Sequence, residues 1–257
     1  MIKRFILALF LIIPSTLLFA GYPYDSVCEI RVDRGGGSAT LIAVSDDKAL
    51  LLTCQHVAER VGDKVKVNWA ATGEEGAGAV VAIGEKGLDI ALCVVPRPLG
   101  LLPVPVTMPS RTKSGPITNI GFPGMTGVLG WQRGEIISIS SDELRYDCRP
   151  IPGMSGGATL DQYGNVIGVI TRYGRSWGLS TSGTDMMYFL RNYAQTHAEA
   201  GWVMDAPETT LQLSAAAPAE QVVVPEDWDE FEMYIFWEYL LPPEMFIHIE
   251  PGEADEH

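Results

Sequence analysis

The segment IPGMSGGATLDQYGNVIGVIT, residues 151–171, decides the fold predicted here. Gly153 and the pair Gly156-Gly157 flank Ser155, and glycine lets a backbone adopt positive φ and approach a ligand closely. Backbone N–H groups can therefore be aimed at one point beside this serine. An ordinary tight turn is the simpler alternative, because Gly, Ser and Pro are common turn residues. The residues after Ser155 indicate two strands joined by a turn.

The same strand-and-turn pattern continues on both sides of this segment. Short runs rich in Val, Ile and Leu, separated by turn residues, predict strands at 38–44, 49–57, 63–69, 78–84, 88–95, 116–123, 130–140, 143–149, 157–160 and 165–171. A proline-rich connector is expected at 95–106. One helix is expected at 184–200, with Thr184 or Asp185 as its cap. Two sets of about five or six strands followed by a helix favour paired β-barrels or a sandwich over an alternating α/β fold.

The charge is concentrated at the C-terminal end. Of the 32 acidic residues, 14 lie from Asp205 onward, where there is no Lys or Arg, which leaves 18 acidic against 18 basic residues before it. Residues 205–257 are therefore expected to form an acidic linker and an aromatic tail, in which residues 228–250 are a candidate partner-binding segment. No basic patch indicates nucleic-acid binding.

The N-terminal segment resembles a secretory signal. Lys3 and Arg4 precede an apolar run from Phe5 to Phe19, and Ala20 supplies a small residue for cleavage. We expect cleavage near Ala20, a secreted or periplasmic location and no stable membrane insertion. An uncleaved anchor is the alternative, since the run is just short of a comfortable membrane span.

Four cysteines remain after this cleavage: Cys28, Cys54, Cys93 and Cys148. They permit three disulfide pairings, between which the sequence cannot choose, and free buried thiols are an equal alternative. No two of them have the spacing of zinc ligands, so we expect no metal and no cofactor.

Three residues form a candidate catalytic set. A serine hydroxyl is a poor nucleophile unless a base removes its proton and a third group orients that base. His56 lies where an apolar strand ends, and Asp89 opens an otherwise apolar strand, where a carboxylate is costly unless it is paired. A surface or core histidine and a strand-start aspartate are the simpler interpretations of each residue alone. The order His56, Asp89, Ser155 is the chymotrypsin-type order.

The segments LLTCQHV, LDIALCVV and PGMSGGATLDQYGNVIGVIT resemble the three signature segments of trypsin-like serine proteases. The likeness covers about residues 24–200 and is greatest to compact bacterial trypsin-like peptidase domains related to the HtrA catalytic module. It implies two six-stranded antiparallel β-barrels of the chymotrypsin type with a C-terminal helix, an all-β fold. Barrel one would span about 24–95, and barrel two with the helix about 107–200.

The resemblance also implies a function and roles for single residues. The protein would be a serine endopeptidase acting on polypeptides, with Ser155 as nucleophile, His56 as base and Asp89 as the group that orients His56. The backbone N–H groups of Gly153 and Ser155 would form the oxyanion hole. The edge strand around Thr171, Arg172 and Tyr173 would pair with the substrate.

Two positions bear on specificity and activation. Arg149 stands where this family often places the floor of the primary pocket, which would favour acidic side chains before the cut, although a surface arginine is the alternative. Met154 stands where the digestive enzymes carry an Asp that pairs with a newly formed N-terminus. That activation mechanism cannot operate here. No PDZ domain is indicated after residue 200.

Other functions fit the residues less well. Residues 153–157 also satisfy G-x-S-x-G, the nucleophile elbow of α/β-hydrolases, but an elbow needs a strand before the serine and a helix after it. A protease-like module that binds without cleaving is the more serious alternative, and Met154 and the acidic tail leave room for it. A third interpretation is a protease that its own tail inhibits.

Overall fold

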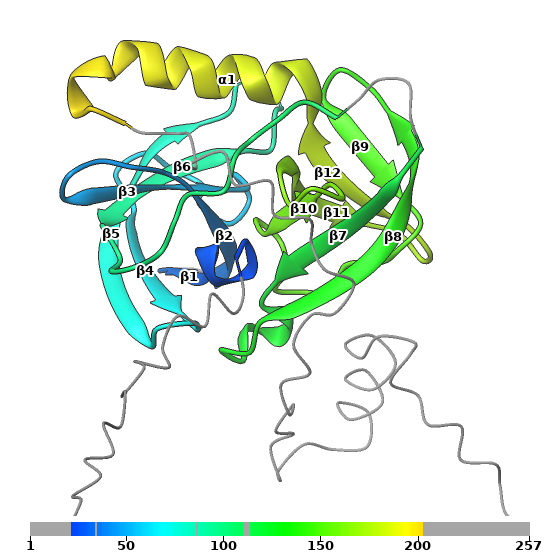
Figure 1. Ribbon diagram of the computed structural model, residues 1–257, viewed down its shortest axis with the longest axis horizontal. Helices are drawn as coiled ribbons and strands as arrows, with labels where there is room; N and C mark the ends of the chain where they lie inside the picture. Colours follow the sequence, from blue (N-terminus) through cyan, green and yellow to red (C-terminus); the bar gives the residue numbers. More distant parts are fainter. Residues whose placement is uncertain (1–21, 34, 86, 110–113, 203–257) are drawn as a thin grey trace, which may run out of the picture.

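The computed structural model describes residues 22–33, 35–85, 87–109 and 114–202. The signal-like segment, the tail and the candidate partner segment 228–250 lie outside these residues. Two closed antiparallel barrels of six strands each make up the described chain. Figure 1 shows them side by side, with the helix α1 (Gly183–Thr196) lying across them. The all-β, chymotrypsin-like fold expected from the sequence is confirmed.

Barrel one contains the first six strands, and its neighbours follow the order β1-β2-β3-β6-β5-β4. Their bounds are β1 (Val27–Val32), β2 (Gly35–Val44), β3 (Lys48–Thr53), β4 (Lys64–Trp69), β5 (Glu74–Ile83) and β6 (Ala91–Pro96). Aliphatic side chains fill its interior, among them Leu41 of β2 and Leu51 of β3, which are directly paired and both fully buried. Each such side chain contributes about 1.5–3 kcal/mol when it leaves water.

Barrel two follows the order β10-β11-β12-β9-β8-β7. Its strands are β7 (Pro116–Gly121), β8 (Gly130–Ile139), β9 (Glu143–Tyr146), β10 (Ala158–Leu160), β11 (Val166–Tyr173) and β12 (Gly178–Ser182). Its interior is smaller and partly polar. The hydroxyl of Thr159 donates to Asn119 Oδ1 at 2.7 Å and lies 2.6 Å from the hydroxyl of Ser180. These buried polar groups satisfy one another, as a buried network must.

Two strands are absent from the sequence-based assignment. The strand β1 carries Glu29 and Arg31 among its apolar residues, and β12, GLSTS, consists of small residues without an apolar run. The residues of β1 do alternate, with Cys28, Ile30 and Val32 separated by Glu29 and Arg31, so its pattern is that of a strand; β12 has no such alternation. Each strand pairs on both edges, β1 with β2 and β4, and β12 with β11 and β9. For β12, barrel closure and not local propensity decides the conformation.

The connector and the helix join the barrels. In the connector, Val104 N–H donates to Leu41 O of barrel one, and Thr107 N–H donates to Val166 O of barrel two. The helix α1 leaves barrel two at β12, and its buried residues Met186, Leu190 and Tyr193 join the main apolar core, which is centred on barrel one. The described part of the chain holds no helix long and apolar enough to cross a membrane.

The expected helix cap is wrong. The helix begins at Gly183, one residue before Thr184, and its N-cap is Ser182, whose side chain makes no capping bond. The Ser182 hydroxyl donates instead to Ile167 O, and Thr184 Oγ1 donates to Ser141 O at 3.2 Å. Both hydroxyls therefore donate to carbonyl groups of neighbouring segments, and neither caps the helix.

Candidate active site

Strand pairing brings His56 and Asp89 together. Thr53, the last residue of β3, pairs with Ala91, the first residue of β6. His56 lies three residues after one end of this antiparallel pair and Asp89 two residues before the other, so both lie at the same end. The turn at 54–58 is closed by the N–H groups of Val57 and Ala58, which donate to Cys54 O.

The Asp89 carboxylate binds His56 twice. Its Oδ2 lies 2.8 Å from His56 Nδ1, and its Oδ1 accepts the His56 backbone N–H at 3.0 Å. Burial raises the pKa of Asp89, but hydrogen bonds from the ring and backbone of His56, together with its charge, outweigh burial and hold the pKa below its usual value. An ionised Asp89 therefore fixes the orientation of the ring, with Nδ1 toward the carboxylate and Nε2 on the side of Cys54.

His56 and Ser155 line one cleft of about 450 Å³ between the barrels. Val57 from barrel one also lines the cleft, as do three residues from barrel two, Pro152, Gly153 and Tyr173. Among the described residues no hydrogen bond joins His56 to Ser155, and His56 Nε2 lies 3.5 Å from Cys54 Sγ. Hydrogen bonds between nucleophile and base are often long before substrate binds, so this arrangement fits a resting site.

The orientation of the peptide between Pro152 and Gly153 decides whether the Gly153 N–H can serve in the expected oxyanion hole. Pro152 O accepts the Gly124 N–H at 2.8 Å, and in a trans peptide the N–H points opposite to the C=O. Gly153 N–H therefore points away from the 122–125 turn. Gly153 has a φ of +95°, which favours glycine. Within the described chain neither Gly153 N–H nor Ser155 N–H donates to another group, so both are available to a substrate carbonyl.

The four residues expected to bind substrate have different surroundings in the structure. Tyr173 lines the cleft, and the exposed guanidinium of Arg149 lies over its ring, 5.0 Å from the centroid. Arg172 forms an ion pair with Glu143, and the buried hydroxyl of Thr171 donates to Leu179 O at 3.2 Å. Arg149 therefore reaches the cleft only through Tyr173, and the side chains of Arg172 and Thr171 are engaged with neighbouring strands.

All four cysteines are free thiols. Burial raises the pKa of Cys93 and of Cys148 to about 12 and raises that of Cys28 and Cys54 still more strongly. Each thiol is therefore protonated and unreactive at neutral pH.

One group of described residues has donor atoms as close as metal ligands. Atoms of Cys54, His56 and Asp89 lie within 4.8 Å of one another. The His56 ring and the Asp89 carboxylate are bound to each other, and the thiol of Cys54 is fully buried and protonated. A metal needs a deprotonated thiolate, so this cluster suits proton transfer better than metal binding.

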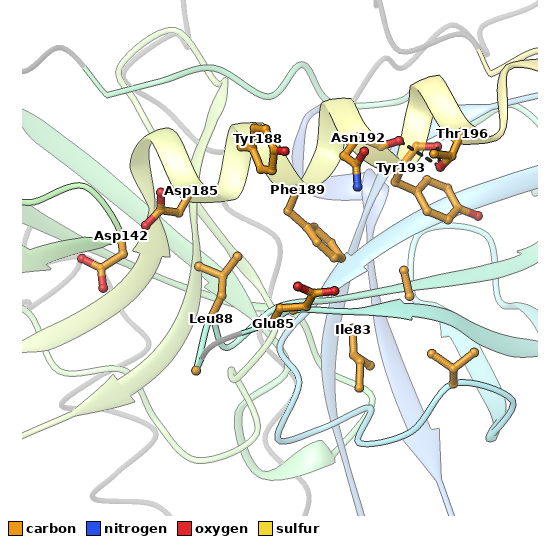
Figure 2. A pocket seen from close by; sticks show the side chains of 14 residues that line it. Ile83, Glu85, Leu88, Asp142, Asp185, Tyr188, Phe189, Asn192, Tyr193 and Thr196 are labelled. Carbon is orange, nitrogen blue, oxygen red and sulfur yellow. Dashed lines mark hydrogen bonds between the residues drawn. The ribbon is translucent and has the colours of Figure 1, made fainter.

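A second hollow, of about 970 Å³, lies between α1 and the loop that precedes Asp89. Figure 2 shows Asp142 and Asp185 at one end of it and Tyr193 and Thr196 at the other. It is larger than the cleft, but its lining includes none of the three candidate catalytic residues. The chemistry therefore belongs to the smaller cleft.

The comparisons with known proteins agree with this geometry. A family model described as the trypsin-like peptidase domain matches residues 37–169, more than half of the chain. The chain belongs to this family. As a member it is a serine endopeptidase, and its substrate is a polypeptide. No curated protein matches the chain by sequence.

Solved structures support the fold of this trypsin-like peptidase. The inactive form of a serine-to-alanine mutant of Rv3671c from M. tuberculosis H37Rv has a TM-score of 0.56 and 20% identity, over 67% of this chain and 88% of that one. The inactive form of Rv3671c protease gives 0.54 and 23%, over 65% and 88%. The serine endoprotease from Yersinia pestis gives 0.54 and 20%, over 68% and 64%.

Two residues at the site escaped the sequence analysis. The hydroxyl of Thr181, in β12, donates to Asp89 O at 3.1 Å and so supports the loop that carries the carboxylate. Ser38, in β2, contacts the loop that carries Ser155. Thr181 lies in a strand without an apolar pattern, and the only signal at Ser38 is the three glycines before it.

Proposed function

We propose that this trypsin-like peptidase is an exported endopeptidase that cleaves peptide bonds through a triad of His56, Asp89 and Ser155. The observation that supports it is the doubly bound His56–Asp89 pair in the same cleft as Ser155. An apolar strand end presents the histidine, and the glycine-flanked turn presents the serine. In this proposal His56 Nε2 turns from Cys54 to the Ser155 hydroxyl when substrate binds, and the histidine then activates the serine.

In the proposed reaction, Ser155 Oγ attacks the carbonyl carbon of the substrate as its proton moves to His56 Nε2. The Gly153 and Ser155 N–H groups donate to the oxygen that becomes negative. The tetrahedral species collapses, the C–N bond breaks, and the amine leaves with the proton from Nε2. A water molecule, deprotonated by His56, then attacks the acyl ester and releases the second product. Asp89 remains ionised and stabilises the charged imidazole throughout.

For specificity we propose that acidic side chains before the cut are favoured. The support is the Arg149 guanidinium at the ring of Tyr173, which lines the cleft. The barrel-one wall of the cleft carries Asp33, Glu59 and Asp63 against Arg60 alone, so it does not favour an acidic group. Arg149 lies over the ring of Tyr173 on the opposite wall, and the cut-site sequences test its role.

We propose export from the cytoplasm on the N-terminal pattern, Lys3 and Arg4 before the apolar run and Ala20 after it. The measurement is the N-terminal sequence of the chain recovered outside the cytoplasm. A start near Gly21 supports cleavage of a signal, and a start at Met1 supports an anchor that remains.

The decisive experiment compares the chain from Gly21 onward with its Ser155→Ala variant. Both are treated with a fluorophosphonate probe and assayed on an unfolded protein. Labelling and cleavage that disappear in the variant support the proposed mechanism. A folded protein that neither labels nor cleaves favours the binding-module alternative. If activity appears only in a chain that ends at residue 204, the acidic tail inhibits the enzyme.

A further inference from the structure

An oxyanion hole works only if Gly153 keeps one conformation, and a glycine has several within easy reach. In the digestive enzymes the resemblance assigns this task to a charged residue beside the nucleophile. Here that residue is Met154, which is fully buried and carries no charge. Its own N–H makes a local bond, to Ile151 O at 3.0 Å, which does not reach Gly153. Something outside the loop must hold Gly153.

Ser38 of barrel one supplies contacts on both sides of the nucleophile. Its hydroxyl donates to Gly153 O at 2.9 Å and accepts the N–H of Phe122 at 2.8 Å. Its own N–H donates to Ser155 O at 2.7 Å, and its C=O accepts the Thr53 hydroxyl at 2.8 Å. One residue thus connects the oxyanion loop, the 122–125 turn and the end of β3, after which His56 follows.

These contacts fix both peptide planes around Gly153. Gly124 holds the carbonyl of Pro152, which sets the plane before Gly153, and Ser38 holds the carbonyl of Gly153, which sets the plane after it. When both planes are set, φ and ψ of Gly153 are set as well. The N–H of Gly153 then points into the cleft before any substrate arrives.

Barrel one also holds the turn that supplies Gly124. The buried carboxylate of Glu29 accepts the Gly127 N–H at 2.9 Å and binds Arg31 at 2.6 Å, and Arg31 Nη2 lies 3.3 Å from Met125 O. Met125 is the one non-glycine residue with positive φ among the described residues, at +58°. The turn is therefore fixed from the same side as Ser38.

The packing around Ser38 is tight. A Cβ on Gly121 would lie 2.8 Å from Ser38 Oγ and 2.8 Å from Met154 Cα, and a Cβ on Gly37 would lie 2.5 Å from Ser155 O. Ser38 is fully buried. A hydroxyl both donates and accepts, so removing it leaves the Phe122 N–H and the Gly153 carbonyl without this partner.

We propose that Ser38 is a positioning residue of the oxyanion hole, which holds Gly153 in its catalytic conformation from barrel one in place of an ion pair at residue 154. The proposal rests on the proposed function of Ser155 and its oxyanion hole. In this proposal the oxyanion hole depends on the contact between the two barrels. The hydroxyl that fixes Gly153 comes from β2 of barrel one, and the loop that carries Gly153 follows β9 of barrel two.

The test compares Ser38→Ala with the wild-type protein and with Ser26→Ala. Ser26 is the matched control, because its buried hydroxyl also donates to a backbone carbonyl, that of Leu102 at 2.6 Å, in another part of the molecule. The measurements are kcat and KM on a peptide substrate, the rate of fluorophosphonate labelling and the melting temperature.

We expect Ser38→Ala to lower kcat by about 10²–10³, the usual effect of losing one oxyanion donor, and to slow labelling, with KM within about threefold. Ser26→Ala should lower only the melting temperature. If Ser38→Ala does not fold, Ser38→Cys fills the site with a slightly larger, weakly hydrogen-bonding atom and should also lose kcat. A kcat within threefold of wild type in the folded variant, or an equal loss in Ser26→Ala, overturns the proposal.

The same experiment separates this proposal from the proposed function. Wild-type labelling that Ser155→Ala abolishes establishes the nucleophile, whatever Ser38 does. A wild-type protein that does not label would overturn both ideas together. Unchanged kcat in Ser38→Ala with normal wild-type labelling overturns only the role of Ser38.

Discussion

The substitution Gly153→Ala tests the contribution of the oxyanion hole to kcat separately from its contribution to stability. A Cβ at this position would lie 2.4 Å from Phe122 O and 2.9 Å from Gly124 N, so the loop has to shift. The φ of +95° adds a backbone cost of about 1–2 kcal/mol for a residue with a side chain. The shift breaks the bond from Gly124 to Pro152 O and turns the Gly153 N–H out of the cleft.

Losing one oxyanion donor costs about 10²–10³ in kcat, or about 3–4 kcal/mol of transition-state stabilisation. Gly100→Ala is the control, since Gly100 has a φ of +75° and open space where a Cβ would lie. We expect both variants to lose stability through their positive φ in urea titrations, Gly153→Ala more because of its clash with Phe122 O, and only Gly153→Ala to lose kcat. Steady-state kinetics on one peptide substrate give the comparison. A Gly153→Ala enzyme with kcat within threefold of wild type would refute the reasoning.

Three further outcomes are expected. Asp89→Asn should lower kcat by about 10⁴, because the ring loses its orienting acceptor. Hydrogen bonding holds the pKa of Asp89 in the folded protein below its ordinary value of 3.8. The ionised carboxylate therefore stabilises the fold above that pH, and this contribution is lost as the pH falls through the folded pKa. In urea titrations from pH 7 to pH 3, the free energy of unfolding should fall less in Asp89→Asn than in wild type. Arg149→Glu should move cut sites, identified by mass spectrometry, away from acidic residues, and an unchanged profile would remove Arg149 from specificity. With pKa values of about 12, Cys93 and Cys148 should resist iodoacetamide at pH 8 in the folded protein and react after unfolding, and rapid labelling in the folded state would contradict their burial.

The sequence predicted the parts of the fold that have a local cause. The hairpin after Ser155 is present as β10 and β11, because apolar runs flank an Asp161–Asn165 turn that its own side chains close. This hairpin also removes the α/β-hydrolase alternative, which needs a helix there. The strand β12 was missed because its pairing partners, not its residues, decide its conformation, whereas β1 alternates apolar and polar residues and could have been assigned from the sequence.

The candidate site also has features that the sequence predicts and features that only the fold determines. The residue types and their order, His56, Asp89 and Ser155, are properties of the sequence and predicted a serine peptidase, which the family match confirms. The ion pair of Arg172 with Glu143 depends on the distance between β9 and β11. No sequence pattern reports such a cross-strand partner.

By itself the sequence determined which chemistry is available: a hydroxyl between glycines, one imidazole at a strand end and one carboxylate before an apolar strand. Only the tertiary structure decided where these groups lie relative to one another. The pairing of Thr53 with Ala91 sets His56 beside Asp89, and Ser38 reaches Gly153 across 115 residues of chain. The physical reason is that side-chain chemistry is local, whereas the directions of backbone N–H and C=O groups are fixed by hydrogen bonds between segments that meet only when the two barrels close and dock.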